Sequence, residues 1–208
     1  MKTYLRHKIC NVIDIKELIA LEFLDFEGKY RNYEEEHDFW ELCFVSEGEI
    51  SLQIEHKTTS LSKNQLVLIS PNKKHSYHSN CGNKNKAFVV CFDSFSQALD
   101  AISEYTFTLE STQLSCMGLI AQESKATFRT NESDHLTVLE TPMFGGQQAL
   151  LLQLEYLLIS LVRSLSSQKS SDIIFFSDEN FHEELVEAIL RYLRENIHKK
   201  ISLSDVCE

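Results

Sequence analysis

Two apolar segments, residues 37–47 and residues 50–55, are separated by a turn at Gly48 and dominate the pattern of the N-terminal half of the chain. The second segment alternates strictly between apolar and polar residues, which is typical of a strand with one buried face. In the first segment, the same alternation places His37, Phe39 and Glu41 on one face. An imidazole and a carboxylate that face the same way can form a binding or catalytic pocket. We therefore predict a β structure with polar groups on its inner surface.

Short predicted strands continue to residue 92. The apolar runs at residues 66–69 and 87–92 are predicted to be buried strands. We expect the first hairpin to turn at Glu47–Gly48, a second turn near His56–Thr59, and another at Asn80–Asn83. Short strands with turns at this spacing predict a β-sandwich or a small barrel.

Beyond Phe92, the hydrophobic period becomes helical. Apolar positions predict helices near Ala98–Ile102 and Leu114–Phe128. A long amphipathic helix is expected to begin at Thr141–Pro142, a favourable N-cap and first-turn pair, and to end near Ser166. The chain is therefore predicted to be α+β, with an N-terminal β domain followed by helices.

Two leucine stripes run along this long helix. One consists of Leu150, Leu154, Leu157 and Leu161, and the other of Leu151, Leu158 and Leu165. Together they form a face that is too wide to pack on a single surface. Either the whole face covers the β domain, or one stripe packs on the domain and the other on a second subunit. We favour the second arrangement, with the first stripe as the interface of a homodimer.

Charge and cysteine usage narrow the class of protein. The formal net charge of −11 disfavours nucleic-acid binding by this chain, because phosphate contacts need clustered lysine and arginine. No segment approaches the roughly 18 uninterrupted apolar residues of a membrane helix, and the N-terminus leads into no apolar signal-peptide region. The cysteines show no paired spacing. These features predict a cytoplasmic protein with free thiols.

The C-terminal residues have a different character. Residues 167–178 are rich in serine and charged residues and are predicted to form a linker. A further apolar helix is expected from about Asp178 to Asn196, and Ser204 is suited to cap another one. An apolar helix face without partner helices indicates a domain that is cut short, so we expect residues 179–208 to be a domain fragment.

Taken together, these segments resemble the AraC family of bacterial transcription regulators over nearly the whole chain. The resemblance rests on residues 37–41, Gly48, residues 71–75, residues 88–92, residues 146–163 and residues 181–207. It implies a cupin-like effector-binding domain with its following helices at 1–140 and a dimerisation helix at 141–166. It also implies a linker at 167–178 and the first part of a helix-turn-helix DNA-binding domain at 179–208.

The family resemblance also implies a function. The chain would sense a small metabolite, such as a sugar, in the cupin barrel and would dimerise. It would be no enzyme and would need no cofactor and no membrane. The full-length protein would bind DNA, but not through this chain, because both recognition helices of the family lie beyond it.

The candidate ligand-binding residues are His37, Phe39, Glu41, His75 and Tyr77. The aromatic rings can stack on a ligand, while the carboxylate and the imidazoles can hydrogen-bond its hydroxyls. A structural role is the alternative: His75 would only fix the turn after Pro71, and Glu41 would only satisfy backbone donors.

A metal site is a second alternative. The spacing of Glu35, His37, Glu41 and Gly48 is similar to the cupin metal pattern, with Glu35 at the first histidine position. Two histidines and a carboxylate can hold Fe, Mn or Zn, so His37, Glu41 and His75 would make a metal-dependent cupin enzyme or a metal-gated sensor. The changed first position argues against this, and no metal ligand is assigned.

We predict structural roles for Trp40 and for two cysteines in the strands. Trp40 should lie on the opposite strand face from Glu41, in a core or an interface. Cys43 and Cys91 lie in apolar strands, where a thiol is inert packing rather than a redox sensor.

Overall fold

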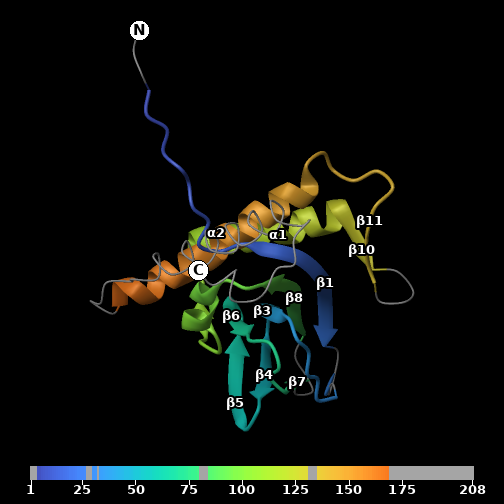
Figure 1. Ribbon diagram of the computed structural model, residues 1–208. Helices are drawn as coiled ribbons and strands as arrows, with labels where there is room; N and C mark the ends of the chain where they lie inside the picture. Colours follow the sequence, from blue (N-terminus) through green and yellow to red (C-terminus); the bar gives the residue numbers. More distant parts are fainter. Residues whose placement is uncertain (1–3, 27–29, 32, 80–83, 131–134, 169–208) are drawn as a thin grey trace, which may run out of the picture. The chain divides into compact units, whose positions relative to one another are not determined.

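The computed structural model describes residues 4–26, 30–31, 33–79, 84–130 and 135–168 (Figure 1). The chain divides into two units, one of which is Ile13–Ser170. The elements below all belong to that unit. The predicted linker at 167–178 lies outside the described residues except for the end of the last helix, and the predicted helix-turn-helix fragment at 179–208 lies wholly outside them.

Two antiparallel sheets form the β part of the unit, as the sequence predicts. The larger sheet has the strand order β1 (Ile15–Phe26), β8 (Asn85–Ser94), β3 (Trp40–Glu47), β6 (Gln65–Ile69) and β9 (Phe107–Thr108). The smaller sheet has the order β2 (Tyr30–Arg31), β7 (His75–Ser79), β4 (Glu49–Ile54) and β5 (Lys57–Ser62).

The alternation along β3 separates two apolar cores. Trp40, Leu42 and Phe44 face one core, which the larger sheet shares with the helices. Cys43 and Val45 face the other core, which lies between the two sheets. Successive strand residues point to opposite faces, so one continuous apolar strand serves both layers. The prediction for Trp40 is confirmed: it is buried on the helix side, and its indole Nε1 donates to the carbonyl oxygen of Ser94 at 3.0 Å.

The predicted hairpin at Glu47–Gly48 is wrong. β3 and β4 belong to different sheets, so this turn carries the chain from the larger sheet to the smaller one. Gly48 has a φ of +76°, and a Cβ there would collide with the carbonyl oxygen of Lys84 and the side chain of Asn85. Only glycine tolerates both conditions, because it has no Cβ. The true hairpin joins β4 to β5 through Glu55 and His56, slightly earlier than predicted.

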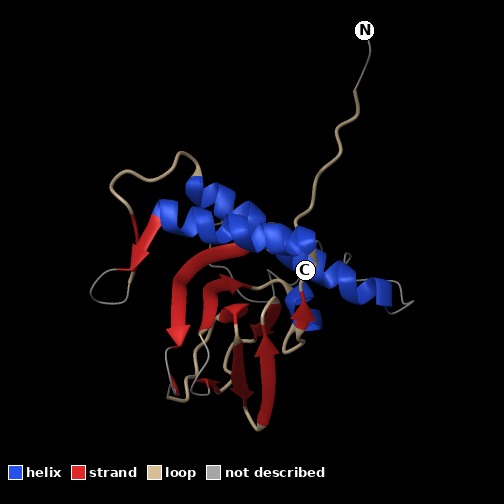
Figure 2. Cartoon of the chain, turned by 180° about the vertical axis from the view of Figure 1, so that it is seen from behind, coloured by secondary structure: helices blue, strands red, loops and turns tan. Residues whose placement is uncertain are grey.

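The helical layer lies along one side of the sheets (Figure 2). It consists of a 3-10 helix η1 (Gln97–Ile102) and the α-helices α1 (Ser111–Thr127) and α2 (Gly146–Gln168). Between α1 and α2 comes a small hairpin of β10 (Phe128–Thr130) and β11 (Leu136–Val138). Both helices were expected near these positions.

The start of the long helix was predicted incorrectly. α2 begins at Gly146, several residues after Thr141–Pro142. Gly145 has a φ of +68°, and its carbonyl oxygen accepts the first helical bond, from the amide of Ala149 at 2.8 Å. The left-handed glycine prevents the helix from starting earlier.

The first leucine stripe of α2 lies inside the protomer. Leu150, Leu154, Leu157 and Leu161 are all fully buried in the core that the helices share with the larger sheet. Their assignment to a dimer interface is therefore wrong for this conformation, because buried side chains cannot contact a second subunit. The exposed apolar residues of α2 are instead Leu152 and Tyr156. Dimerisation itself stays a prediction.

By length and composition alone, Gly146–Leu165 could span a membrane. Its first leucine stripe packs in the core of this unit.

Candidate functional site

Glu41 lies near the start of β3, the central strand of the larger sheet, and is only 4% exposed. One carboxylate oxygen, Oε2, lies 3.0 Å from His37 Nε2. The other, Oε1, accepts a hydrogen bond from the Tyr77 hydroxyl and lies 3.5 Å from His75 Nε2. The thiol of Cys91 lies 3.7 Å from Oε2. Four of the five predicted ligand-binding residues therefore meet at one carboxylate.

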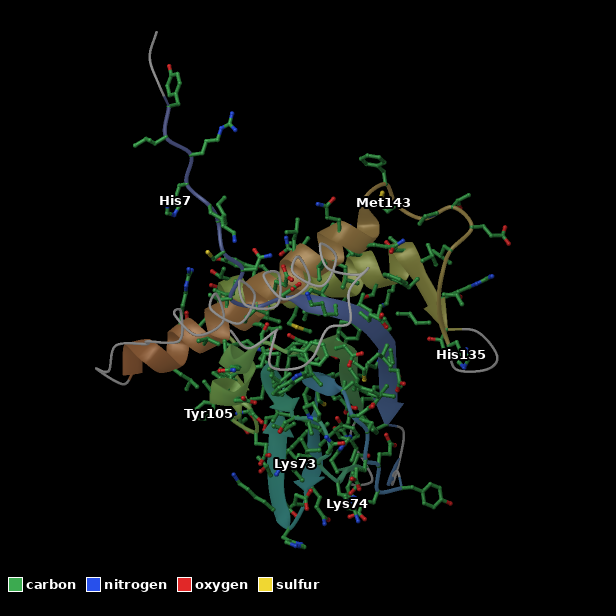
Figure 3. The ribbon with its side chains drawn as sticks, viewed as in Figure 1. His7, Lys73, Lys74, Tyr105, His135 and Met143 are labelled. Atoms are coloured by element: carbon green, nitrogen blue, oxygen red, sulfur yellow. The ribbon has the colours of Figure 1, made fainter. Side chains whose placement is uncertain are left out.

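Three segments bring these groups together. Glu41 pairs with Cys91 across β3 and β8, so their side chains share one face of the larger sheet. His75 and Tyr77 are two residues apart on β7 of the opposite sheet, so both side chains lie on the face that points at Glu41. His37 lies just before β3. The lysines that precede β7, Lys73 and Lys74, lie in the part of the unit away from α1 and α2 (Figure 3).

Backbone carbonyls orient both imidazoles. His37 Nδ1 lies 3.0 Å from the carbonyl oxygen of Phe39, and His75 Nδ1 lies 2.9 Å from that of Lys73. A carbonyl only accepts, so each Nδ1 carries a proton and donates it. Each Nε2 then faces the Glu41 carboxylate. His75 Nε2 is buried, and the Glu41 Oε1 atom at 3.5 Å is a long contact for it.

The charges of the site reinforce one another. Burial alone would raise the pKa of Glu41, but hydrogen bonds from His37 and His75, the charge of His75 and the Tyr77 hydroxyl lower this pKa to about 2. Burial also opposes the charged form of His75, but the Glu41 carboxylate outweighs it and raises the His75 pKa. Glu41 is therefore an anion at neutral pH, held by donors on two sheets.

The two thiols nearby are unreactive. Burial, with the negative charge of Glu41 beside it, raises the pKa of both Cys43 and Cys91 well above that of a free thiol. The protonated thiol is a poor nucleophile. This agrees with the sequence-based assignment of both residues to inert packing.

The aromatic residues do not act alike. The Phe39 ring stacks on the His37 ring, with centroids 3.8 Å apart, and is partly buried. Tyr77 is buried in the core between the sheets, and its hydroxyl is engaged by Glu41. Tyr77 therefore positions Glu41, whereas Phe39 lies at the wall of the cavity described next.

A cavity of about 130 Å³ opens beside Glu41. It is lined by Ala20, Glu22, Leu24, Glu35, His37, Phe39, Glu41, Tyr77, Val89 and Cys91. We call it the inner cavity. The sequence pattern did not predict Glu22 and Cys91 as lining residues, because their position depends on how β1 and β8 pair with β3. Three of the lining residues are glutamates, so the inner cavity favours a cationic or hydrogen-donating ligand.

The comparison with family models gives one match. Residues 19–124 match the model described as the AraC-like ligand binding domain, which is half of the chain. The chain belongs to this AraC-like family. The matched residues include both sheets except for the first four residues of β1, the inner cavity and most of α1. No curated protein matches the AraC-like chain.

Solved structures show distant similarity to this AraC-like chain. Unsaturated-fatty-acid-bound ToxT from Vibrio cholerae is 12% identical, with a TM-score of 0.47, over 93% of this chain and 69% of that one. A cupin superfamily protein from Desulfitobacterium hafniense is 15% identical, with a TM-score of 0.34, over 38% and 71%. A predicted oxalate decarboxylase from Thermotoga maritima is 11% identical, with a TM-score of 0.33, over 35% and 64%.

Proposed function

We propose that this AraC-like domain is the effector-sensing part of a transcription regulator, and that the effector binds in the inner cavity against Glu41. The observation that carries the proposal is the convergence of His37, His75 and Tyr77 on one buried carboxylate at a cavity wall. A buried ion of this kind is expensive to maintain unless it is fully paired. Its position in the ligand-binding family supports a role in recognition.

The inner cavity limits the chemistry of the effector. Its volume of about 130 Å³ is smaller than the roughly 300 Å³ at which pockets for drug-sized ligands begin. A sugar would need the cavity to widen, whereas a small cation or amine would not. Glu22, Glu35 and Glu41 supply acceptors for such a ligand.

The strand β1 supports a route from the cavity to the helical layer. Ala20 and Glu22 line the inner cavity, while Leu21 between them is buried in the core shared with α1 and α2. A ligand that shifts β1 would therefore change the packing of the helices. Regulation requires that the ligand bind one helix arrangement more tightly than the other.

Native mass spectrometry tests the proposal. The purified chain should carry a small bound molecule, and Glu41→Gln should lose it because the amide removes the charge at the centre of the site. Glu34→Gln is the matched control, because Glu34 is exposed and outside the cavity. A wild type that carries no added mass, or a Glu41→Gln chain that keeps the added mass as fully as the wild type and the control do, would contradict the proposal.

A metal-gated sensor is the second candidate. One ligand atom from each of His37, Glu41 and His75 lies within 4.8 Å of the others. Both imidazoles keep their proton on Nδ1, so the Nε2 lone pairs are available to a cation when the rings are neutral. Two histidines and a carboxylate suit Fe, Mn or Zn, and such a metal would supply Lewis acidity or a ligand-binding position. The donor set therefore fits a metal.

Cobalt titration tests this candidate, because tetrahedral Co²⁺ bound by nitrogen and oxygen ligands absorbs visible light. His75→Ala should abolish the absorbance, and His56→Ala should not, since His56 is exposed in the β4–β5 turn. A wild-type chain that stays colourless at saturating Co²⁺, and gains no mass from Zn²⁺ in native mass spectrometry, would remove both the metal-gated sensor and the metal-dependent enzyme.

The remaining functional predictions depend on the whole regulator. We propose a cytoplasmic homodimer that does no catalysis and whose full-length form binds DNA. Membership of the AraC-like family supports these proposals.

A further inference from the structure

We propose that a groove between α1 and the larger sheet binds an amphipathic carboxylate, a molecule with a long apolar body and one anionic head. The groove has a volume of about 470 Å³. It is lined by Phe23, Leu24, Asp25, Phe44, Ser46, Lys86, Ala87, Phe88, Leu114, Met117, Gly118, Ala121 and Lys125. We call it the α1 groove.

The floor of the α1 groove is aromatic. Phe23 stacks on Phe88 with centroids 4.4 Å apart and an angle of 9° between the rings. Phe88, Phe44 and Met117 are buried, yet Phe23 remains 45% exposed. An aromatic side chain of β1 that is half exposed beside a groove offers apolar area to an incoming ligand.

The wall formed by α1 contains an unusual glycine. Gly118 lies in the middle of the helix, and a Cβ there would meet no atom within 4 Å. Neither a tight contact nor a left-handed backbone requires this glycine. A mid-helix glycine costs about 1 kcal/mol relative to alanine. Its effect in this position is to leave the groove open.

The charge at the rim selects an anion. Lys125 Nζ lies 4.3 Å from the centre of the Phe23 ring and pairs with no acidic residue in the part of the chain that is described. The other lysine, Lys86, lies 3.4 Å from Asp25 and is neutralised by it. An unpaired ammonium on a chain with a net charge of −11 would attract a carboxylate above an apolar floor.

Other ligand chemistries fit less well. A sugar or an inorganic phosphate would leave the aromatic floor uncovered, and a cationic amphiphile would be repelled by Lys125. The volume of about 470 Å³ lies within the range of small-molecule sites. A second hollow of about 650 Å³, beside the β10–β11 hairpin, shares Phe23, Leu24 and Lys125 with the groove. It adds both Glu22 and Arg129, and its volume gives a longer chain room to continue.

This site is separate from the inner cavity. Among the residues that the structure describes, Leu24 alone lines both spaces. The inference therefore goes beyond the proposed function, and either can fail without the other.

Isothermal titration with dodecanoate, below its micelle concentration, tests the inference. Dodecyltrimethylammonium has the same chain and the opposite charge, and is the matched control ligand. We expect dodecanoate to bind at least about tenfold more tightly, because one charge-assisted contact has this effect. Failure of the folded wild type to bind dodecanoate, or equal affinity for both ligands, would overturn the inference.

Variants locate the bound molecule. Gly118→Leu should fill the groove and abolish binding while raising helix propensity, so loss of folding is not expected. Lys125→Met should weaken dodecanoate binding about tenfold and leave binding of the cationic amphiphile unchanged or stronger. Lys57→Met, on the exposed edge strand β5, is the control for loss of a lysine and should bind as the wild type does.

Circular dichroism confirms that each variant is folded before titration. Glu41→Gln changes a residue that lines the inner cavity and not the α1 groove, so the folded variant should also bind dodecanoate normally. Wild-type affinity in Gly118→Leu, or loss of binding in Glu41→Gln but not in Gly118→Leu, would move the ligand out of the groove and overturn the inference.

Discussion

Tyr77 donates its hydroxyl hydrogen to the carboxylate of Glu41, and this bond joins the two sheets across the core between them. Tyr77 is 3% exposed and Glu41 is 4% exposed. A hydrogen bond to a buried charge contributes more than a bond between neutral groups. The pair therefore couples the binding site to the stability of the whole sandwich.

Tyr77→Phe should destabilise the domain by about 2 kcal/mol, because it removes a donor from a buried carboxylate while keeping the ring. Urea unfolding measures the change. Tyr105→Phe is the control: Tyr105 is 44% exposed, and its replacement should have little effect. Equal stability of the two variants would mean that the bond contributes nothing.

Acid should destabilise the domain through Glu41. The folded-state pKa of about 2 lies below the ordinary value of 4.5, so the ionised form is favoured by folding. This contribution is fully present above pH 4.5 and is lost as the pH falls towards 2; it amounts to about 3 kcal/mol. In urea unfolding between pH 5 and pH 3, Glu41→Gln should show a shallower loss of stability than the wild type. Parallel curves would contradict the low pKa.

Leu154→Asp should unfold the domain rather than produce a folded monomer. Leu154 is fully buried in the core, and an unpaired charge there costs several kcal/mol. Leu152→Asp changes a residue that is 56% exposed on the same helix and should preserve folding. Thermal melting and light scattering distinguish these effects. A folded Leu154→Asp chain whose mass in light scattering falls from that of a dimer to that of a monomer would restore the buried stripe as an interface.

Two glycine substitutions should have opposite effects on stability. Gly48→Ala should destabilise by at least about 1 kcal/mol, because its φ is positive and the new Cβ would meet Lys84 and Asn85. Gly118→Ala should stabilise by up to about 1 kcal/mol, since α1 has open space at that position. Thermal unfolding of both variants shows whether each substitution raises or lowers the melting temperature. A change in the same direction in both would refute this account of the two glycines.

Thiol labelling should separate the cysteines by burial. Cys10 is exposed and should react rapidly with iodoacetamide at pH 7.5, whereas Cys43 and Cys91 should react only on unfolding. Their raised pKa values add to the effect of burial. Peptide mass mapping identifies the modified residues. Rapid labelling of Cys91 in the folded chain would reopen a redox role for it.

The pattern in the sequence was sufficient for the layers and the main candidate residues. Alternation along residues 40–45 correctly separates Trp40 from Glu41, because side-chain direction in a strand depends only on position. It also places His37 and Glu41 together, since they are close in sequence. Leucine spacing correctly predicts the existence of α2, although a left-handed Gly145 moves its start.

Only the tertiary structure decided which surfaces these elements contact. The sequence shows that Leu154 is apolar but not whether the sheet or a second subunit covers it, because both partners are equally apolar. It marks Gly48 as a turn but not as a passage between sheets, because strand pairing joins residues far apart in the chain. For the same reason, the meeting of His75, Tyr77 and Cys91 at Glu41, and the α1 groove, follow from packing between distant segments.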